Sequence, residues 1–314
     1  MTTALVTGVT GQDGSYLVER LLDEGVTVHG VLRPGDAATA PGTHEHRVDL
    51  TDRAGLRAVV RDVAPDAVYN LAGISSVARS WAEPELTAEV NGLAVATLLD
   101  AALAVQEATG RRVAFVQASS AEIFGTPDRV PQDERTAVRP TNPYGAAKAL
   151  AHHLVGVYRA RGLHASAAVL FNHESPRRPP AFVTRRITQG AARVAREGGV
   201  ITLGNLDARR DWGWAPDYVD GLLRLARHPE ALDVVLATGE THSVRELAVA
   251  ALRHAGVADP AAHLAVDPAL VRPTDTAQLV GDATLARTAL GWRPTRSFDE
   301  IVAAMVAHDL ALPA

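Results

Sequence analysis

Short apolar runs alternate with longer helical patterns through the first half of this 314-residue chain, and this alternation restricts its fold more than any other feature. The runs are rich in Val and Ala, and most are followed by a stretch with helical periodicity. The runs cover residues 4–8, 26–32, 46–50, 66–72, 112–120 and 164–172, and the helical patterns cover 14–24, 53–63, 84–107 and 142–162. Strands that are apolar throughout are typical of a parallel sheet covered on both faces. The sequence therefore predicts a doubly wound α/β domain.

The pattern changes after Phe171, where arginines gather in loop-like segments between shorter helical stretches. We interpret this part as a smaller C-terminal lobe that binds substrate. The predicted dinucleotide-binding Rossmann domain covers 1–170 and about 214–238, and the predicted substrate lobe covers about 171–213 and 239–314.

Composition excludes several classes of function. A net charge of −5 excludes a nucleic-acid binder driven by overall charge, and the absence of cysteine excludes disulfides and thiolate chemistry. No apolar run approaches the roughly 18 residues that a membrane helix needs. His44-Glu45-His46 has no third ligand at a metal-binding spacing. We therefore expect a cytoplasmic protein that binds neither a membrane nor a metal ion.

A glycine-rich loop follows the first predicted strand. Glycines at this place permit a tight turn, so that a pyrophosphate can lie on the amides at the start of the next helix. The predicted cofactor contacts in this loop are Gly8, Thr10, Gly11, Gln12, Asp13 and Gly14.

The ends of three further predicted strands bear on which cofactor binds. Arg33 stands where an acidic residue would bind the ribose of NAD, and an arginine there suits the 2′-phosphate of NADP. Asp36 lies near enough to keep NAD possible. The later strand ends add Asp49, Leu50, Leu71 and Ala72 to the predicted cofactor contacts.

Tyr144 and Lys148 are spaced four residues apart, just inside a helix that Thr141-Asn142-Pro143 can start. Both side chains therefore lie on one face of that helix. Of the 31 Lys and Arg residues only Lys148 is lysine, and there are only 5 tyrosines, so this spacing is improbable as a coincidence. An adjacent ammonium and an oxidised nicotinamide stabilise a phenolate, so Tyr144 can accept the proton of a sugar hydroxyl while hydride leaves the carbon.

Ser120 and Glu122 lie at the carboxyl end of the fifth predicted strand, where α/β sheets keep their reactive groups. Ser120 can hydrogen-bond the same hydroxyl as Tyr144. A carboxylate such as Glu122 can remove a carbon-bound proton, which simple alcohol oxidation does not require. The alternative for Glu122 is a residue at a helix N-terminus or an exposed residue.

Arginines in loops or helix starts of the second lobe suit a diphosphate, because the planar guanidinium pairs with phosphate oxygens in a bidentate way. We expect about half of them to be solvated surface charges instead. The candidates are Arg177, Arg178, Arg185, Arg186, Arg209, Arg210 and Arg272.

Seven segments together resemble the GDP-mannose 4,6-dehydratases, which are nucleotide-sugar enzymes of the extended short-chain dehydrogenase/reductase class. The segments are TGVTGQDGSYL, SSAEIFG, YGAAK, LFNHESPRR, LGNLDARRDWG, TGETHSVRE and RPTD, and the resemblance runs from residue 3 to about 293.

The resemblance implies a mechanism. Tyr144, assisted by Ser120 and Lys148, deprotonates the C4 hydroxyl of the hexose of GDP-mannose as hydride passes to NADP⁺. Glu122 then removes the C5 proton, water leaves from C6, and hydride returns to C6, which gives GDP-4-keto-6-deoxymannose. The residues that the resemblance assigns to substrate are Ser75, Asn172, Val183, Arg186, Arg210, Arg272 and Asp275.

Two departures from the family pattern bear on specificity and assembly. Gly73-Ile74-Ser75-Ser76 replaces Ala-Gln-Ser-His, which removes an amide and an imidazole near the hexose. Pro34 stands where the family has a second arginine, and the segment between Arg33 and Arg47, which in the family helps to bind NADP and to join dimers, is short. We expect a homodimer through the helices at 84–107 and 142–162, with a tetramer as the alternative.

Other functions compatible with the same residues are another nucleotide-sugar epimerase, decarboxylase or reductase of this class, and a non-catalytic cofactor-sensing protein. Glu122 argues against a plain epimerase but not against a decarboxylase. A cofactor sensor would not need Ser120, Glu122, Tyr144 and Lys148 together.

Overall fold

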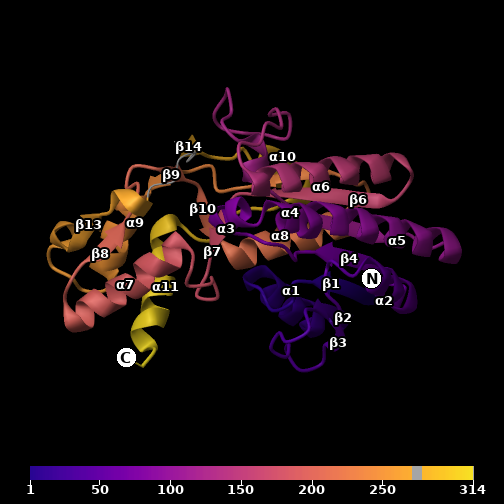
Figure 1. Cartoon of the computed structure of the whole chain (residues 1–314), viewed down its shortest axis with the longest axis horizontal. Coiled ribbons are helices and arrows are strands. Elements are labelled where there is room, and N and C mark those ends of the chain that lie inside the picture. The colour runs from indigo at the N-terminus through magenta and orange to yellow at the C-terminus, as the bar shows by residue number, and fades with distance from the viewer. Residues whose placement is uncertain (271–277, 314) are drawn as a thin grey trace.

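A seven-stranded parallel sheet forms the larger part of the molecule (Figure 1). The computed structural model describes residues 1–270 and 278–313. The strand order is β11-β6-β5-β4-β1-β2-β3. The strands are β1 (Thr3–Thr7), β2 (Thr27–Leu32), β3 (His44–Arg47), β4 (Ala67–Asn70), β5 (Ala114–Ser120), β6 (His164–Leu170) and β11 (Asp233–Leu236). The predicted doubly wound α/β sheet is thus confirmed.

Helices cover both faces of this sheet because the strand side chains are apolar on both sides. Ala4 and Val6 of β1 pack into one hydrophobic core, and Leu5 between them packs into the other. The first core is closed by α1 (Gln12–Asp23), α8 (Ala215–Arg227) and α10 (Thr284–Leu290). The second is closed by α2 (Arg53–Val63), α5 (Ala94–Thr109) and α6 (Pro143–Ala160).

A smaller lobe lies beside the sheet and has a hydrophobic core of its own (Figure 1). Its helices are α7 (Val183–Glu197), α9 (Val244–His254) and α11 (Phe298–Ala311). Its strands are β7 (Asn172–Glu174), β8 (Ile201–Leu203), β9 (Arg209–Arg210), β10 (Trp212–Trp214), β12 (His242–Ser243), β13 (Leu264–Val266) and β14 (Gln278–Leu279). The short helices of the chain are α3 (Val77–Ala82), α4 (Pro84–Ala88), the π-helix η1 (Glu89–Leu93), and the 3₁₀ turns η2 (Ala121–Phe124), η3 (Pro260–His263) and η4 (Pro268–Leu270).

Most predicted bounds agree with the structure to within two residues, and two elements differ further. The third strand covers His44–Arg47 instead of 46–50, because Asp49 accepts hydrogen bonds from Thr51 and turns the chain into α2. The helix predicted over 84–107 is interrupted by η1.

The continuous helical run Pro84–Thr109 has the length and apolar composition of a membrane span, contrary to the sequence expectation. It spans 26 residues, and 61% of its most apolar window is buried inside the protein. Its packing against α2 and α6 is that of a core helix.

Candidate active site

The carboxyl ends of β1, β4 and β5 meet at one edge of the sheet and are joined by buried polar side chains. The Thr7 hydroxyl donates to Asn70 Oδ1 at 2.7 Å, and Asn70 Nδ2 donates to Gln117 Oε1 at 2.7 Å. The amides of Leu71 and Ala72 donate to Thr7 Oγ1 at 3.2 and 3.0 Å. These bonds place the predicted cofactor residues Leu71 and Ala72 directly beside the glycine loop.

The glycine loop is packed too closely for side chains at two of its glycines. Gly8 has φ +71°, and a Cβ there would lie 2.8 Å from the Ala72 nitrogen. A Cβ on Gly14 would lie 2.1 Å from the Gly8 oxygen. The loop runs into α1 at Gln12, so its amides face the position that a pyrophosphate takes at a helix N-terminus.

The same loop is bonded to β7 of the smaller lobe. Asp13 Oδ2 lies 2.9 Å from His173 Nε2, and Gln12 Nε2 donates to the His173 carbonyl at 3.0 Å. The Ser175 hydroxyl donates to Gln12 Oε1 at 2.9 Å. His173 also stacks on Tyr218, with ring centroids 4.5 Å apart. Gln12 and Asp13 therefore serve as a joint between the lobes as well as the start of α1.

The charges at this joint stabilise each other. Burial alone would raise the pKa of Asp13, but the adjacent His173 brings it below its ordinary value. Burial alone would lower the pKa of His173, but Asp13 brings it above its ordinary value. The two shifts agree in describing a buried Asp13 carboxylate paired with a His173 imidazolium.

Tyr144 and Lys148 lie on the first turns of α6, with the Lys148 ammonium 5.9 Å from the Tyr144 ring centroid. Lys148 Nζ donates to the Ala118 carbonyl of β5 at 2.9 Å. Burial lowers the pKa of Lys148 to about 8 and raises the pKa of Tyr144 to about 12, although the Ser120 hydroxyl, hydrogen-bonded to Tyr144, lowers it. The predicted trio of Ser120, Tyr144 and Lys148 is therefore assembled at the end of β5.

Glu122 lies in η2, immediately after β5, and its amide donates to Ser120 Oγ at 3.2 Å. Its Oε2 accepts a hydrogen bond from Asn142 Nδ2 at 2.8 Å. The carboxylate thus stands in the same cluster as Ser120 and Tyr144. Glu122 is also half-buried in the first turn of η2, so it has the helix-start position of the alternative interpretation as well.

Asn91 in the π-helix η1 holds the loop after β4 against Lys148. It accepts from the Ile74 amide and donates to the Ile74 carbonyl, each at 2.8 Å. A Cβ on Gly73 would lie 2.7 Å from Asn91 Oδ1 and 3.7 Å from Lys148 Nζ. π-Bulges occur frequently at functional sites, and this one holds a buried amide against the backbone of Ile74.

Arg33, at the end of β2, is already paired. Its guanidinium lies 3.0 Å from Asp36 Oδ1, and Arg47 Nη1 donates to the Asp36 carbonyl at 2.8 Å. Hydrogen bonds from Thr51 lower the pKa of Asp49, and the charge of Arg33 adds to this effect. Leu50 is buried beside Asp49. The structure therefore brings Arg33, Asp36 and Asp49 together.

The candidate arginines of the second lobe have different partners. Arg185 is buried in an ion pair with Asp309 of α11, Arg178 pairs with Glu174 at 3.3 Å, and Arg209 pairs with Glu246 at 3.1 Å. Arg186 is exposed on α7, whose first residue is Val183. Arg210 of β9 donates to the Arg209 carbonyl, and Asn172 pairs with Trp212 in the β7–β10 ladder. Ser75 is exposed in the loop after β4.

Two predicted substrate residues, Arg272 and Asp275, lie outside the described residues. Among residues 1–270 and 278–313, no group of three His, Asp or Glu side chains has the arrangement of a metal site.

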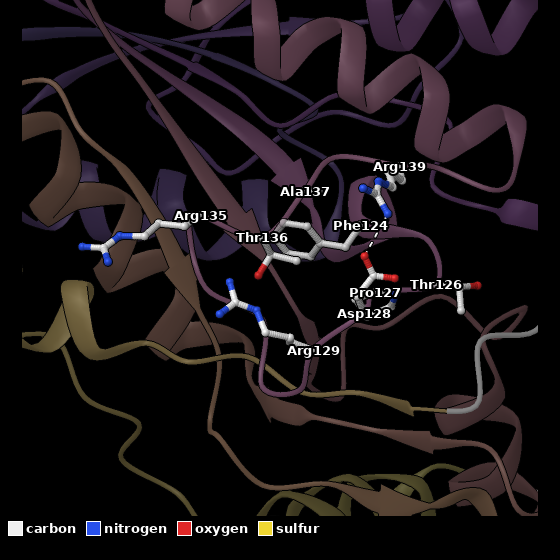
Figure 2. Close-up of a pocket in the computed structure, with 9 residues that line it drawn as sticks. All are labelled: Phe124, Thr126, Pro127, Asp128, Arg129, Arg135, Thr136, Ala137 and Arg139. Atoms are coloured by element: carbon white, nitrogen blue, oxygen red, sulfur yellow. Dashed lines mark hydrogen bonds and ion pairs between the residues drawn. The ribbon is translucent and has the colours of Figure 1, made fainter.

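A surface pocket of about 140 Å³ lies beside η2 (Figure 2). Phe124 forms part of its wall, and Arg139 pairs with Asp128 across it at 2.8 Å. None of the predicted site residues within the described part of the chain lines this pocket. A second, more open depression lies at the opposite edge of the sheet, around Arg112 and His164, and it also contains none of them.

Sequence reasoning missed two residues of this cluster, His173 and Asn91, and one contact, that of Asn142 with Glu122. His173 was visible only as part of the LFNHESPRR segment, and Asn142 only as part of a helix start. All three act through partners that are 17 or more positions away, which a local pattern does not contain.

The parallel sheet, its glycine loop and the Tyr144–Lys148 pair define a Rossmann-fold protein of the extended short-chain dehydrogenase/reductase class, in which many members modify nucleotide sugars. The family model described as GDP-mannose 4,6 dehydratase matches residues 5–305. The chain belongs to the GDP-mannose 4,6-dehydratase family.

Individual relatives agree with this assignment. A GDP-mannose 4,6-dehydratase of Sinorhizobium fredii is 39% identical over 98% of this chain and 96% of its own length. A UDP-glucose 4-epimerase of Thermus thermophilus, solved with NAD, has a TM-score of 0.85 and 30% identity over 99% of each chain. RMD from Pseudomonas aeruginosa, solved with NADPH, has a TM-score of 0.80 and 25% identity over 99% of this chain and 100% of its own. These neighbours indicate a nicotinamide cofactor.

Proposed function

We propose that this protein is an NADP-dependent hydro-lyase that converts GDP-mannose to GDP-4-keto-6-deoxymannose. Family membership supports the reaction, and one feature of the site carries the proposal: the Glu122 carboxylate stands beside the Ser120–Tyr144 pair at the end of β5. Oxidation of an alcohol needs only a base for the hydroxyl. A second base at this place serves the removal of a carbon-bound proton.

The first step falls to the residues of β5 and α6. Tyr144 accepts the C4 hydroxyl proton, Ser120 hydrogen-bonds the same hydroxyl, and the Lys148 ammonium stabilises the phenolate. A bound nicotinamide cofactor would supply the hydride acceptor for C4 and the hydride donor for C6. Burial is the largest cause of the raised pKa of Tyr144, about 12, which leaves the tyrosine a poor proton acceptor unless positive charge beside the ring stabilises its ionised form.

The second step falls to Glu122. The C4 ketone makes the adjacent C5 proton acidic, Glu122 removes this proton, and the same proton passes to the C6 hydroxyl, which departs as water. The proton that Tyr144 took from the C4 hydroxyl is then available to C5 when hydride returns to C6. A decarboxylase would need a carboxylated sugar instead, and a plain epimerase would leave Glu122 without a role.

The residues at the sheet edge fit a dinucleotide. Gly8 and Gly14 have no side chains, so a diphosphate can approach the backbone of the loop and the N-terminal amides of α1 closely. Thr10, Gly11, Gln12 and Asp13 complete this loop, with Asp49, Leu50, Leu71 and Ala72 along the sheet edge. Arg33 and Arg47 favour NADP, whereas Asp36 pairs with Arg33 and leaves NAD possible.

The smaller lobe is proposed to hold the GDP part of the substrate. Its candidate contacts are Asn172, Val183, Arg186 and Arg210, with Arg272 and Asp275 by resemblance, while Ser75 lies on the hexose side. In this division the dinucleotide-binding domain is 1–170 with about 214–238, and the substrate lobe is about 171–213 with 239–314.

A homodimer is proposed through the α4–α5 run and α6. Large apolar side chains are exposed on this face: Leu93 is 44% exposed, Leu150 41% and Val157 56%. Such a patch on one side of two neighbouring helices supports association with a second copy. Leu150→Glu should shift the protein toward monomer in analytical ultracentrifugation, and an unchanged dimer would place the interface elsewhere.

The activity test is direct. Purified protein supplied with NADP⁺ and GDP-mannose should form a product that has lost one water, seen by mass spectrometry, with no net change in NADPH. Glu122→Gln should still oxidise C4, seen as reduced nicotinamide, but should form little dehydrated product. Unchanged GDP-mannose, or epimerised sugar without loss of water, would refute the dehydratase proposal.

A further inference from the structure

Asn142 stands between the helix that carries Tyr144 and the turn that carries Glu122. Its side chain is 7% exposed and has a partner at each end. Its Oδ1 accepts the Gly145 amide at 2.8 Å, which caps α6, and its Nδ2 donates to Glu122 Oε2 at 2.8 Å. We propose that Asn142 is a positioning residue that holds the Glu122 carboxylate in the orientation needed to remove the C5 proton. The inference rests on the role proposed above for Glu122.

The orientation of this amide is fixed by its two partners. The Gly145 N–H requires an acceptor, and the Glu122 carboxylate, which only accepts when ionised, requires a donor. The carboxamide satisfies both at once, whereas the opposite orientation would satisfy neither. A serine, threonine or aspartate cap could supply the acceptor for α6 but not this N–H donor to Glu122.

The surrounding backbone leaves little freedom to either residue. Pro143 begins α6, and the Asn142 carbonyl accepts the Ala146 amide at 3.0 Å. A Cβ on Gly145 would lie 2.5 Å from the Glu122 carbonyl oxygen, so the first turn of α6 lies directly against η2. The Glu122 amide is bonded to Ser120 as well. Glu122 is thus held at its backbone amide by Ser120 and at Oε2 by Asn142.

This arrangement leaves one carboxylate oxygen for chemistry. Among the described residues, Oε2 accepts from Asn142 and no hydrogen bond reaches Oε1. A donor on one oxygen stabilises the ionised carboxylate and selects the other as the base. The charged or titratable groups that act on the adjacent Tyr144 are Glu122 itself, Arg178 and Asp13, and Lys148 lies one helical turn further along α6.

Two substitutions separate positioning from capping. Asn142→Ser keeps a cap of the kind that Ser76, Ser243 and Ser297 provide elsewhere in this chain, but it removes the amide N–H that donates to Glu122. Asn142→Asp keeps the acceptor for Gly145 and replaces the donor with a second carboxylate. Tm should stay close to that of the wild type in the serine variant, since α6 remains capped.

The expected result is a selective loss of the elimination step. In single turnovers, Asn142→Ser should form reduced nicotinamide at nearly the wild-type rate, while formation of dehydrated product slows by about 10- to 100-fold, as for loss of a hydrogen bond to a charged group. KM for GDP-mannose should change little. Asn142→Asp should slow elimination further, and the acid limb of its pH–rate profile should move to higher pH.

Ser297→Ala serves as the matched control, because it removes the cap of α11 in the smaller lobe and should lower Tm with turnover unchanged. The positioning role is overturned if Asn142→Ser eliminates water at the wild-type rate, or if it slows hydride transfer and elimination equally together with a fall in Tm. Failure of the Glu122 role is distinct, since Glu122→Gln would then itself eliminate water at the wild-type rate.

Discussion

Helix α6, which carries Tyr144, and the contact between α7 and α11 of the smaller lobe each bury one cation, Lys148 and Arg185, and the two cations have opposite surroundings. Lys148 is 6% exposed and Arg185 is 5% exposed. Arg185 forms an ion pair with Asp309, whereas Lys148 has only a neutral carbonyl within hydrogen-bonding distance among the described residues. A buried cation without a counter-ion is unfavourable for folding and is therefore a signature of function. The paired arginine contributes to the fold.

The sharpest test of this contrast is Lys148→Arg, which preserves the charge. The guanidinium is too wide to replace a compact ammonium beside the Tyr144 phenolate, so turnover of GDP-mannose should fall by about 10²- to 10⁴-fold, the usual contribution of a general base. Arg185→Lys, the same exchange in reverse, should change turnover much less. Normal turnover of Lys148→Arg would make the Tyr144 spacing a coincidence.

Breaking the Arg185–Asp309 pair should affect stability. Arg185→Met leaves Asp309 as an uncompensated buried charge and should lower the free energy of unfolding by about 3–5 kcal/mol. The double variant Arg185→Met with Asp309→Leu should recover most of this loss in urea titrations. If the single variant is as stable as the wild type, the ion pair does not stabilise the fold, and Arg185 is again a candidate for binding the diphosphate of the substrate.

The lowered pKa of Lys148 predicts a pH dependence of stability in the protein without cofactor. The folded pKa of about 8 lies below the ordinary value of 10.5, so between these values the unfolded chain binds more protons than the folded one. Stability should therefore rise with pH across this window, by at most about 3 kcal/mol. Lys148→Met should remove this rise, and a rise of equal size in both proteins would assign it to another group.

The smallest effect is expected at Arg33, whose side chain is 65% exposed and paired with Asp36. Asp36→Asn would free the guanidinium for a 2′-phosphate, and the preference for NADP over NAD should increase by about threefold to fivefold, as is typical of exposed pairs. Dissociation constants for both cofactors measure this preference. A shift toward NAD would mean that Asp36 does not compete with the phosphate.

The contrast between Lys148 and Arg185 also shows how much of the structure the sequence could predict. Hydrophobic periodicity and helix capping depend on residues that are close in the sequence, so the predicted bounds of α2, Arg53–Val63, are correct. The four-residue spacing likewise places Tyr144 and Lys148 on one face of α6. Arginine in a loop is ambiguous, because phosphate and carboxylate attract it equally. Only the fold shows that Asp309 lies beside Arg185.

The polar residues around the site show the same limit. Asn142 has the sequence pattern of a helix cap and also has that role, but its second partner, Glu122, is 20 positions away. His173 meets Asp13 across 160 positions, and Asn91 reaches Ile74 through a π-helix that no residue pattern marks. These contacts are tertiary, so the secondary-structure propensities of the residues do not predict them.

The joint made by Gln12 and Asp13 with β7 limits how this chain can be recombined with its relatives. A chimera joined near residue 171 would take the glycine loop from one parent and His173 and Ser175 from the other. Unless both parents match at these four positions, the buried carboxylate and amide would lose their partners in the very segment that should cradle the diphosphate. The two lobes therefore have to be exchanged together in such a chimera, although each has its own core.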